Sequence, residues 1–274
     1  MPNKITTELQ DLTYLSWAKI RNSSGTAGSF LKAYDDLGTK KKYYKLSNYN
    51  YSEGITGHES VNEIIVDRLL TILNVPHLAY HLVHAKVIID DEEYTTYACM
   101  SEDFKEKGES KIALDAYFQA EREKGESLLD FCIRNGWEEY IYQMLVVDYL
   151  ILNRDRHGAN IEVLRNRRDK TIRLAPLFDH GLSLIFSCQK EAAVEKYDIL
   201  ADTRIQCCVG SNSAFENLKL IPYDKLPKLN PLHVTDEAVL MADLENVLPE
   251  IWRKKIWEMI WARWNQYESF CNKR

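Results

Sequence analysis

Three polar residues in the middle of the chain have the types and the spacing that phosphoryl transfer requires. Asp155 and Asn160 stand in a charged, glycine-containing loop, Asn-Arg-Asp-Arg-His-Gly-Ala-Asn, that follows an apolar run. Asp179 comes after a second, shorter apolar run and stands two residues before Gly181. Mg²⁺ takes oxygen ligands from carboxylates and amides, while a separate carboxylate must orient or deprotonate the accepting hydroxyl. These residues therefore offer one base and two metal ligands.

The order of these residues separates them from ordinary turn residues. Asp and Asn are common at turns and helix caps, so either loop alone fits a structural role equally well. The Asp-x-x-x-x-Asn offset, however, equals that of the protein-kinase catalytic loop, where Asp is the base and Asn a metal ligand. Asp179-His-Gly then stands where a kinase has Asp-Phe-Gly. We expect His157 to pack beneath the first loop and His180 to replace the Phe, because neither has a partner at metal-ligand spacing.

The N-terminal part of the chain contains candidates for the rest of a nucleotide site. Residues 22–29 form a small-residue loop whose backbone amides can approach phosphates, although a plain hairpin turn fits it equally well. Lys45 follows in a β-like run, and Glu63 lies on the next helix with Glu59 one turn earlier. The candidate phosphate contacts in the loop are Ser24, Gly25, Thr26, Ala27 and Gly28.

The pattern of apolar residues predicts an α+β fold with two lobes. Runs at 43–46, 79–89 and 94–100 are rich in β-branched and aromatic residues, and the acidic residues 90–93 suit a hairpin loop. Apolar residues at helical spacing predict a helix over 59–73. After residue 104 the spacing predicts helices over 127–136, 138–152, 237–247 and 249–271. We therefore predict a small β-rich lobe with one helix over 1–104, a larger and mostly helical lobe over 105–274, and a ligand between them.

The composition excludes several classes of protein. The 274 residues are 45% hydrophobic, which is incompatible with a disordered chain, and no apolar run is long enough to span a membrane. The first residues lack the apolar region of a signal peptide, so we expect a cytoplasmic protein with reduced cysteines and no membrane partner. The net charge of −6 argues against direct nucleic-acid binding, and the basic runs 40–42 and 165–170 are read as solvated faces.

Over roughly residues 17–265 the sequence resembles the kinase domain of HipA-like serine/threonine kinases. The resemblance rests on Asn-x-Asp-x-His-x-x-Asn ending at Asn160 and on Ala-Pro-Leu-Phe-Asp ending at Asp179. The small-residue loop, Lys45 and Met-Ser-Glu-Asp-Phe ending at Phe104 also fit. The two acidic segments are similar to phosphatidylinositol 3- and 4-kinases as well. The resemblance implies a bilobal protein-kinase-like fold.

The resemblance also implies a role for each candidate residue. Asp155 would be the catalytic base, Asn160 and Asp179 would bind Mg²⁺, and Lys45, anchored by Glu63, would contact the phosphates of ATP. Backbone atoms of the hinge would receive adenine, and serines of the small-residue loop would be sites of inactivating autophosphorylation. The hinge residues are Met100, Ser101 and Glu102, and the candidate serines are Ser23, Ser24 and Ser29.

Three functions remain compatible with the sequence. The first is an ATP- and Mg²⁺-dependent kinase acting on a Ser or Thr hydroxyl of a protein. The second is a kinase for a small molecule or a lipid headgroup. The third is a nucleotide-binding regulator, or a partner of an antitoxin, that has lost turnover; loss of Asp155, Lys45 or Asp179 would be its usual sign, and all three are present.

Overall fold

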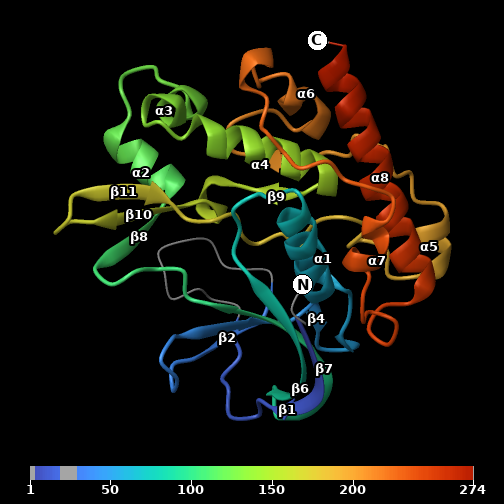
Figure 1. Cartoon of the computed structure of the whole chain (residues 1–274). Coiled ribbons are helices and arrows are strands. Elements are labelled where there is room, and N and C mark those ends of the chain that lie inside the picture. The colour runs from blue at the N-terminus through green and yellow to red at the C-terminus, as the bar shows by residue number, and fades with distance from the viewer. Residues whose placement is uncertain (1–3, 19–29, 274) are drawn as a thin grey trace.

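The computed structural model describes residues 4–18 and 30–273. Figure 1 shows the helices α3, α4, α6 and α8 at one end of the molecule and a β-sheet at the other, with α1 between them. The strands are β1 (Ile5–Asp11), β2 (Lys32–Asp35), β3 (Lys42–Lys45), β4 (Tyr49–Asn50), β5 (Gly54–Ile55), β6 (Tyr80–Ile89), β7 (Glu92–Glu102), β8 (Glu109–Ala113), β9 (Asp155–Arg156), β10 (Glu162–Asn166), β11 (Thr171–Leu174) and β12 (Gln206–Cys207). The helices are α1 (Glu59–Ile72), α2 (Leu114–Glu121), α3 (Leu128–Arg134), α4 (Glu138–Ile151), α5 (Glu191–Glu195), α6 (Ala214–Leu218), α7 (Asp236–Leu240) and α8 (Glu250–Asn272), with the 3₁₀ turns η1 (Gly158–Asn160) and η2 (Tyr223–Lys225).

The N-terminal sheet has the strand order β1-β6-β7-β3-β2. All neighbours are antiparallel except β1 and β6, which run parallel. The turn between β6 and β7 is shorter than the predicted loop 90–93, because Asp90 and Asp91 both adopt positive φ, at 51° and 67°. Two such residues make a tight hairpin turn that lets pairing continue to Ile89 and Glu92. The three predicted strands are thus confirmed, and β7 is longer than predicted.

Helix α1 confirms the predicted helix over 59–73 and connects the sheet to the helices. Its apolar residues, among them Ile64, Ile65 and Leu69, are fully buried, and the helix contacts β6, β7 and α7. Arg68 donates to the carbonyls of Leu240 and Ala242 at 2.9 and 2.8 Å. Burial of these apolar side chains fixes the position of Glu63, which lies on the same helix.

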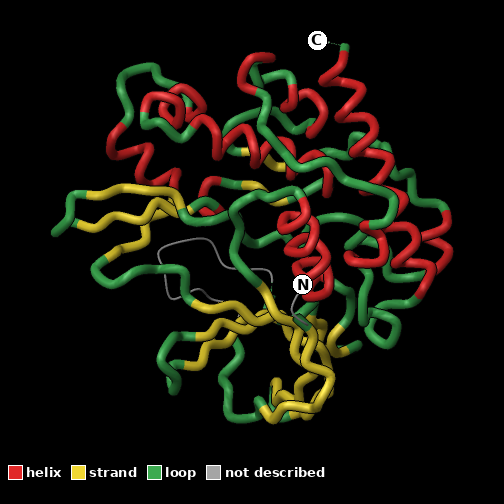
Figure 2. Tube along the Cα trace, in the orientation of Figure 1, coloured by secondary structure: helices red, strands yellow, loops and turns green. Residues whose placement is uncertain are grey.

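The C-terminal part is helical where strong periodicity predicted helices, but it also contains strands. Helix α8 confirms the prediction over 249–271 and buries Trp252, Trp257 and Trp264. The prediction over 237–247 is wrong in length: α7 ends at Leu240, and Asp243 then takes a left-handed conformation (φ 60°) that a helix interior excludes. Figure 2 shows the strands of the sheet β11-β10-β8 within this otherwise helical part. No helix among residues 4–18 and 30–273 is long and apolar enough to cross a membrane.

Candidate active site

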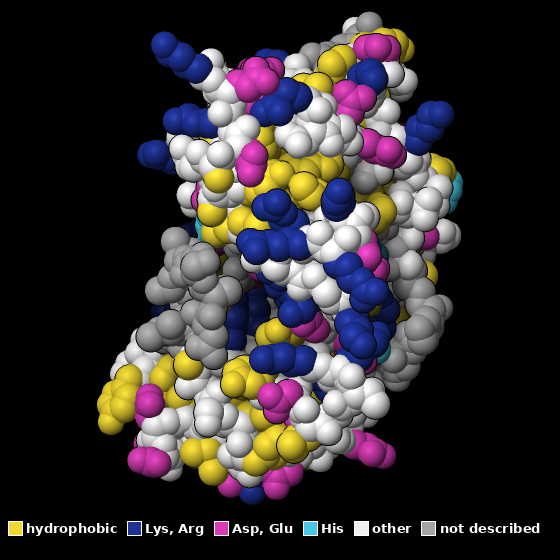
Figure 3. Space-filling view, turned by 90° about the vertical axis from the view of Figure 1, so that its left-hand side faces the viewer, with side chains coloured by type: hydrophobic (Ala, Val, Ile, Leu, Met, Phe, Trp, Pro, Cys, Tyr) yellow, Lys and Arg dark blue, Asp and Glu magenta, His cyan; other side chains and the backbone are white. Residues whose placement is uncertain are grey.

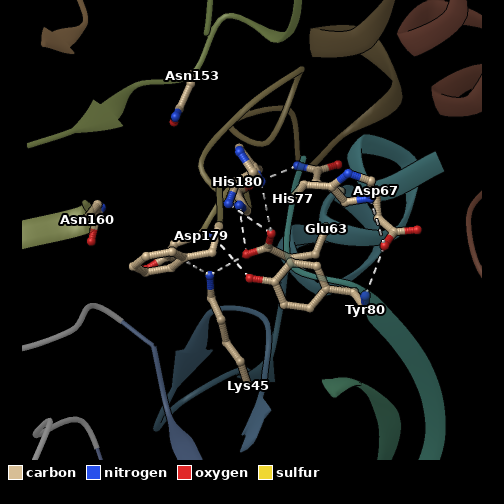
Figure 4. A network of polar contacts seen from close by, with 12 residues as sticks. Lys45, Glu63, Asp67, His77, Tyr80, Asn153, Asn160, Asp179 and His180 are labelled. Carbon is tan, nitrogen blue, oxygen red and sulfur yellow. Dashed lines mark hydrogen bonds and ion pairs between the residues drawn. The ribbon is translucent and has the colours of Figure 1, made fainter. Parts of the chain in front are cut away.

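Lys45 lies at the end of β3 and forms ion pairs with two acidic residues that are distant in the sequence. Its Nζ donates to Glu63 Oε1 at 2.8 Å and to Asp179 Oδ1 at 2.5 Å, as Figure 4 shows. Burial alone would lower the pKa of Lys45, but the two carboxylates raise it above its ordinary value. Lys45 is therefore a fixed positive charge at all physiological pH values.

Glu63 is fully buried and uses both carboxylate oxygens to hold the segment that carries Asp179. Oε1 accepts the Gly181 N–H at 3.0 Å in addition to Lys45, and Oε2 accepts the His180 N–H at 2.8 Å. Glu59 takes a different role, because its carboxylate accepts the backbone N–H of Asn48 at 3.1 Å. Of the two acidic residues on this helix face, Glu63 is the one that bonds to Lys45.

Asp179 adopts a left-handed backbone conformation with φ at 61°. Aspartate adopts this conformation more readily than most residues with a side chain, and contacts with other segments can hold it there. Here the Asp179 N–H donates to the Tyr80 hydroxyl at 3.1 Å, and Asn62 Nδ2 donates to the carbonyls of Gly181 and Ser183, both at 3.0 Å. The contacts direct the Asp179 carboxylate toward Lys45 and toward Lys32, whose Nζ lies 3.7 Å away.

The loop with Asp155 and Asn160 begins where α4 ends. Leu152 closes the helix in a left-handed conformation, and Asn153 Nδ2 donates back to Asp148 at 2.9 Å. Asn160 Nδ2 donates to the Asp155 carbonyl at 2.8 Å, an arrangement that leaves its Oδ1 as an acceptor. The Asp155 side chain remains about one-third exposed (32%), so it is accessible to a substrate.

Arg156 connects this loop to the segment before Asp179. Its guanidinium is fully buried, bonds to both carboxylate oxygens of Asp148, and donates to the carbonyls of Asn160 and Phe178 at 3.4 and 3.1 Å. The sequence analysis missed this residue. Asp148 could have indicated it from the sequence, since a carboxylate inside the apolar run of α4 needs a buried counter-ion.

Two neighbours of Asp155 change its acidity in opposite directions. Burial raises the pKa of Asp155, the Coulomb interaction with His157 lowers it, and the Asp179 carboxylate raises it again, with a net upward shift. His157 Nε2 lies 3.7 Å from Asp155 Oδ2, so this histidine faces the acidic residue and does not pack beneath the loop as expected. His180 is fully buried, and burial lowers its pKa well below the usual range, which keeps the ring neutral in the place of a Phe.

A cavity of about 410 Å³ opens beside Lys45 and Asp179. Its apolar wall includes Leu78, Phe104 and Phe178, and Lys32 and Tyr80 add polar groups that the sequence analysis did not identify.

Ser101 and Glu102 of the predicted hinge line this cavity. Met100 is not among the lining residues, and its side chain packs against the apolar cluster on the sheet. Glu63 lies behind Lys45, and Asp155 and Asn160 lie outside the lining. The loop residues Ser24, Gly25, Thr26, Ala27 and Gly28, and the serines Ser23 and Ser29, fall outside the described residues.

Comparison with known proteins gives matches among solved structures. No family model and no curated protein matches the chain. The crystal structure of the Helicobacter pylori proinflammatory kinase CtkA matches with a TM-score of 0.59 and 14% identity over 92% of this chain and 93% of that one. A chain of the HipA–HipB toxin–antitoxin complex with operator DNA from Shewanella oneidensis MR-1 matches with a TM-score of 0.42 and 16% identity, over 93% of this chain and 59% of its own length. The chain thus shares the overall fold of the kinase CtkA along nearly its whole length.

Proposed function

We propose that the chain is an ATP- and Mg²⁺-dependent kinase that phosphorylates a Ser or Thr hydroxyl of a protein, as HipA-like kinases do. The observation that carries the proposal is the position of Lys45, which Glu63 and Asp179 hold at the wall of a cavity large enough for a nucleotide's base and sugar. The fold shared with the kinase CtkA supports it. The proposal includes two lobes divided near residue 104, with the cavity between them.

The cavity provides distinct surroundings for the two ends of ATP. Adenine fits the apolar wall formed by Leu78, Phe104 and Phe178 beside Ser101 and Glu102 at the C-terminal end of β7. The phosphates then point to Lys45 and Lys32, whose ammonium groups neutralise their charge. We assign the loop 24–28 as the cover of these phosphates.

Asn160 and Asp179 have the oxygen atoms that a magnesium site needs. The Asn160 amide is oriented by its bond to the Asp155 carbonyl, and the Asp179 carboxylate is oriented by Lys45. One amide oxygen and one carboxylate, completed by phosphate oxygens, suit Mg²⁺. The bound ion supplies charge neutralisation at the transferred phosphoryl group.

Asp155 is the proposed catalytic base. Its carboxylate lies in the loop next to Asn160 and remains accessible, so it can accept a hydrogen bond from the acceptor hydroxyl and then its proton. Burial and the nearby Asp179 raise its pKa, which makes it a stronger base than an exposed aspartate.

Labelled ATP tests the proposal. Three proteins are incubated with γ-labelled ATP and Mg²⁺: wild type, Asp155→Asn and the control Asp224→Asn, which changes an exposed carboxylate elsewhere. The label transferred to protein and the amount of ADP formed are then measured. We expect label and ADP with wild type and the control, and neither with Asp155→Asn, which should still bind ATP. Mapping the label identifies whether Ser23, Ser24 or Ser29 accepts phosphate.

The other outcomes assign the alternative functions. ADP without labelled protein indicates a small molecule or water as acceptor. Tight ATP binding with neither product indicates a regulator without turnover, and activity of Asp155→Asn equal to wild type overturns the assignment of the base.

A further inference from the structure

A second cavity, lined by basic residues, lies at the tip of the β10–β11 hairpin, outside the proposed nucleotide site. Its volume is about 720 Å³. Figure 3 views the molecule from the side toward which this hairpin points, and Lys and Arg side chains gather across the middle of that face. The cationic residues that line the cavity, called here the basic groove, are Lys107, Arg165, Arg167 and Arg168.

These four cations have no acidic partner within the described part of the chain, where no ion pair or side-chain hydrogen bond engages them. Other cations on the same small sheet are neutralised. Lys111 Nζ lies 2.8 Å from Asp103, and Arg173 Nε lies 2.8 Å from Glu109. The whole chain carries a net charge of −6, so the groove holds local positive charge against the overall balance. Such a surface attracts an anionic partner.

Buried contacts fix the shape of the groove. Asn166 is only 8% exposed; its Oδ1 accepts the backbone N–H groups of Arg168 and Asp169, and its Nδ2 donates to the Asp169 carboxylate at 2.7 Å. Gly108 packs against Asn166 with φ at 90°, and a Cβ there would lie 3.2 Å from the Asn166 amide. Because these bonds order the backbone before a ligand arrives, binding loses less entropy.

Residues of the same two strands, β8 and β10, line both the groove and the cavity of the proposed active site. β10 starts at Glu162, two residues after the end of η1 at Asn160. Glu162 at the start of β10 lines the first cavity, and Arg165 lines the groove. At about 3.3 Å per residue, the five steps from Asn160 to Arg165 span up to roughly 17 Å, a distance that an extended peptide covers in about five residues.

We propose that the basic groove binds an acidic segment of the phosphate-accepting protein, about four to six residues from the accepting hydroxyl. This inference rests on the proposed kinase function. Arginine side chains bind carboxylates through paired hydrogen bonds, and three of the four cations are arginines. A nucleic acid suits the groove less well, because single strands bind along basic tracks with aromatic stacking platforms, and no aromatic residue lines the groove within residues 4–18 and 30–273.

Synthetic peptides with one Ser in an Ala-Gly background test the proposal. A Glu-Glu pair is placed about three to seven residues before or after the Ser, and matched peptides carry Gln-Gln or Lys-Lys. Both binding, by fluorescence anisotropy, and kcat/KM are measured. We expect wild type to prefer one Glu-Glu position about tenfold over Gln-Gln, and the preference to weaken as salt is raised.

Charge reversal supplies the decisive comparison. Arg167→Glu with Arg168→Glu should lose the preference for Glu-Glu and gain one for Lys-Lys, with ATP turnover in the absence of peptide unchanged. The control Lys190→Glu with Lys228→Glu changes the same charge at exposed sites outside the groove and should behave as wild type. The gain for Lys-Lys peptides also shows that the variant is folded.

Measuring both peptide binding and phosphoryl transfer distinguishes the proposal of the basic groove from the proposal of the kinase function. Selective binding of Glu-Glu peptide without any phosphoryl transfer supports the groove and overturns the kinase function. Transfer to all peptides at equal kcat/KM, in wild type and in the charge-reversed variant, overturns the groove. A labelled single-stranded RNA that binds more tightly than every peptide, and is released by the same charge reversal, also overturns the acidic-peptide assignment.

Discussion

Lys45 Nζ and Glu63 Oε1 lie 2.8 Å apart, and the same Glu63 oxygen also accepts the Gly181 N–H at 3.0 Å. One buried oxygen thereby couples the lysine of β3 to the loop that carries Asp179. Displacement of α1 would break both bonds, and displacement of β3 or of that loop would break one of them. The position of Lys45 at the cavity therefore depends on three segments that are far apart in the sequence.

Replacing Glu63 by Gln should weaken both the loop and the lysine. The amide has one acceptor oxygen, and its NH₂ group would face an N–H donor of His180 or Gly181. We expect the free energy of unfolding to fall by about 1–3 kcal/mol, and the Kd for ATP to rise. Urea denaturation and ATP titration measure the two effects. Glu59→Gln is the matched control, since a Gln there can still accept the Asn48 N–H; equal losses in both variants would contradict the special role of Glu63.

Asp155 should lower the stability of the folded protein at neutral pH. Its pKa is raised in the folded state, mainly by burial, so folding disfavours the ionised form. The resulting destabilisation is present above the folded pKa and disappears as pH falls below the unfolded value. Asp155→Asn should therefore have a higher Tm than wild type at pH 7, with a difference that shrinks toward acidic pH. A constant difference across that range, measured by thermal unfolding, would refute this linkage.

His157 should set the acidic limit of the reaction. When protonated, it lowers the pKa of Asp155 from 3.7 Å away. His157→Gln removes this positive charge, so the pKa of Asp155 rises and a base at this position becomes protonated at a higher pH. We expect the acidic limb of the pH profile of kcat/KM to move to higher pH. His233→Gln, at an exposed position, should leave the profile unchanged.

The Arg156–Asp148 pair should be more sensitive to loss of one member than of both. Arg156→Met leaves the Asp148 carboxylate buried without its counter-ion, a change that typically costs about 3–5 kcal/mol. Arg156→Met combined with Asp148→Leu removes both charges and should restore part of the loss. Urea denaturation of the single and double variants measures the coupling free energy between Arg156 and Asp148. A double variant less stable than Arg156→Met would contradict the view that the unpaired Asp148 charge causes the loss.

Gly181 should not tolerate a side chain. A Cβ at this position would lie 3.0 Å from Lys45 Nζ and 3.3 Å from the Glu59 backbone carbonyl. Gly181→Ala should displace Lys45 and lower stability by about 1–3 kcal/mol, with a larger relative loss of ATP binding. At Gly38 the nearest atom lies 3.7 Å from a Cβ, so Gly38→Ala is the control. ATP binding by Gly181→Ala equal to wild type would contradict this account.

Local patterns in the sequence determined the parts of the fold that are themselves local. The helices α1, α4 and α8 follow from apolar residues at helical spacing, and β6 and β7 follow from β-branched and aromatic runs. Strand β8 carries only Ile112 as a strong strand former, and its pairing with β10 comes from tertiary contacts. The early end of α7 likewise depends on the left-handed conformation of Asp243.

In the candidate site, too, some residues could be predicted from the sequence and others only from the tertiary structure. Residue types and order identified Lys45, Glu63, Asp155, Asn160 and Asp179, since chemistry restricts which side chains fit each role. The bond between Lys45 and Glu63 agrees with the role that the resemblance implied for Glu63, and the tertiary structure supplied the further groups that complete the site. These groups, Lys32, Tyr80 and the Arg156–Asp148 pair, meet the site through contacts between distant segments. Such contacts carry no periodic pattern, because they depend on how whole elements pack and on which buried charges must find a partner.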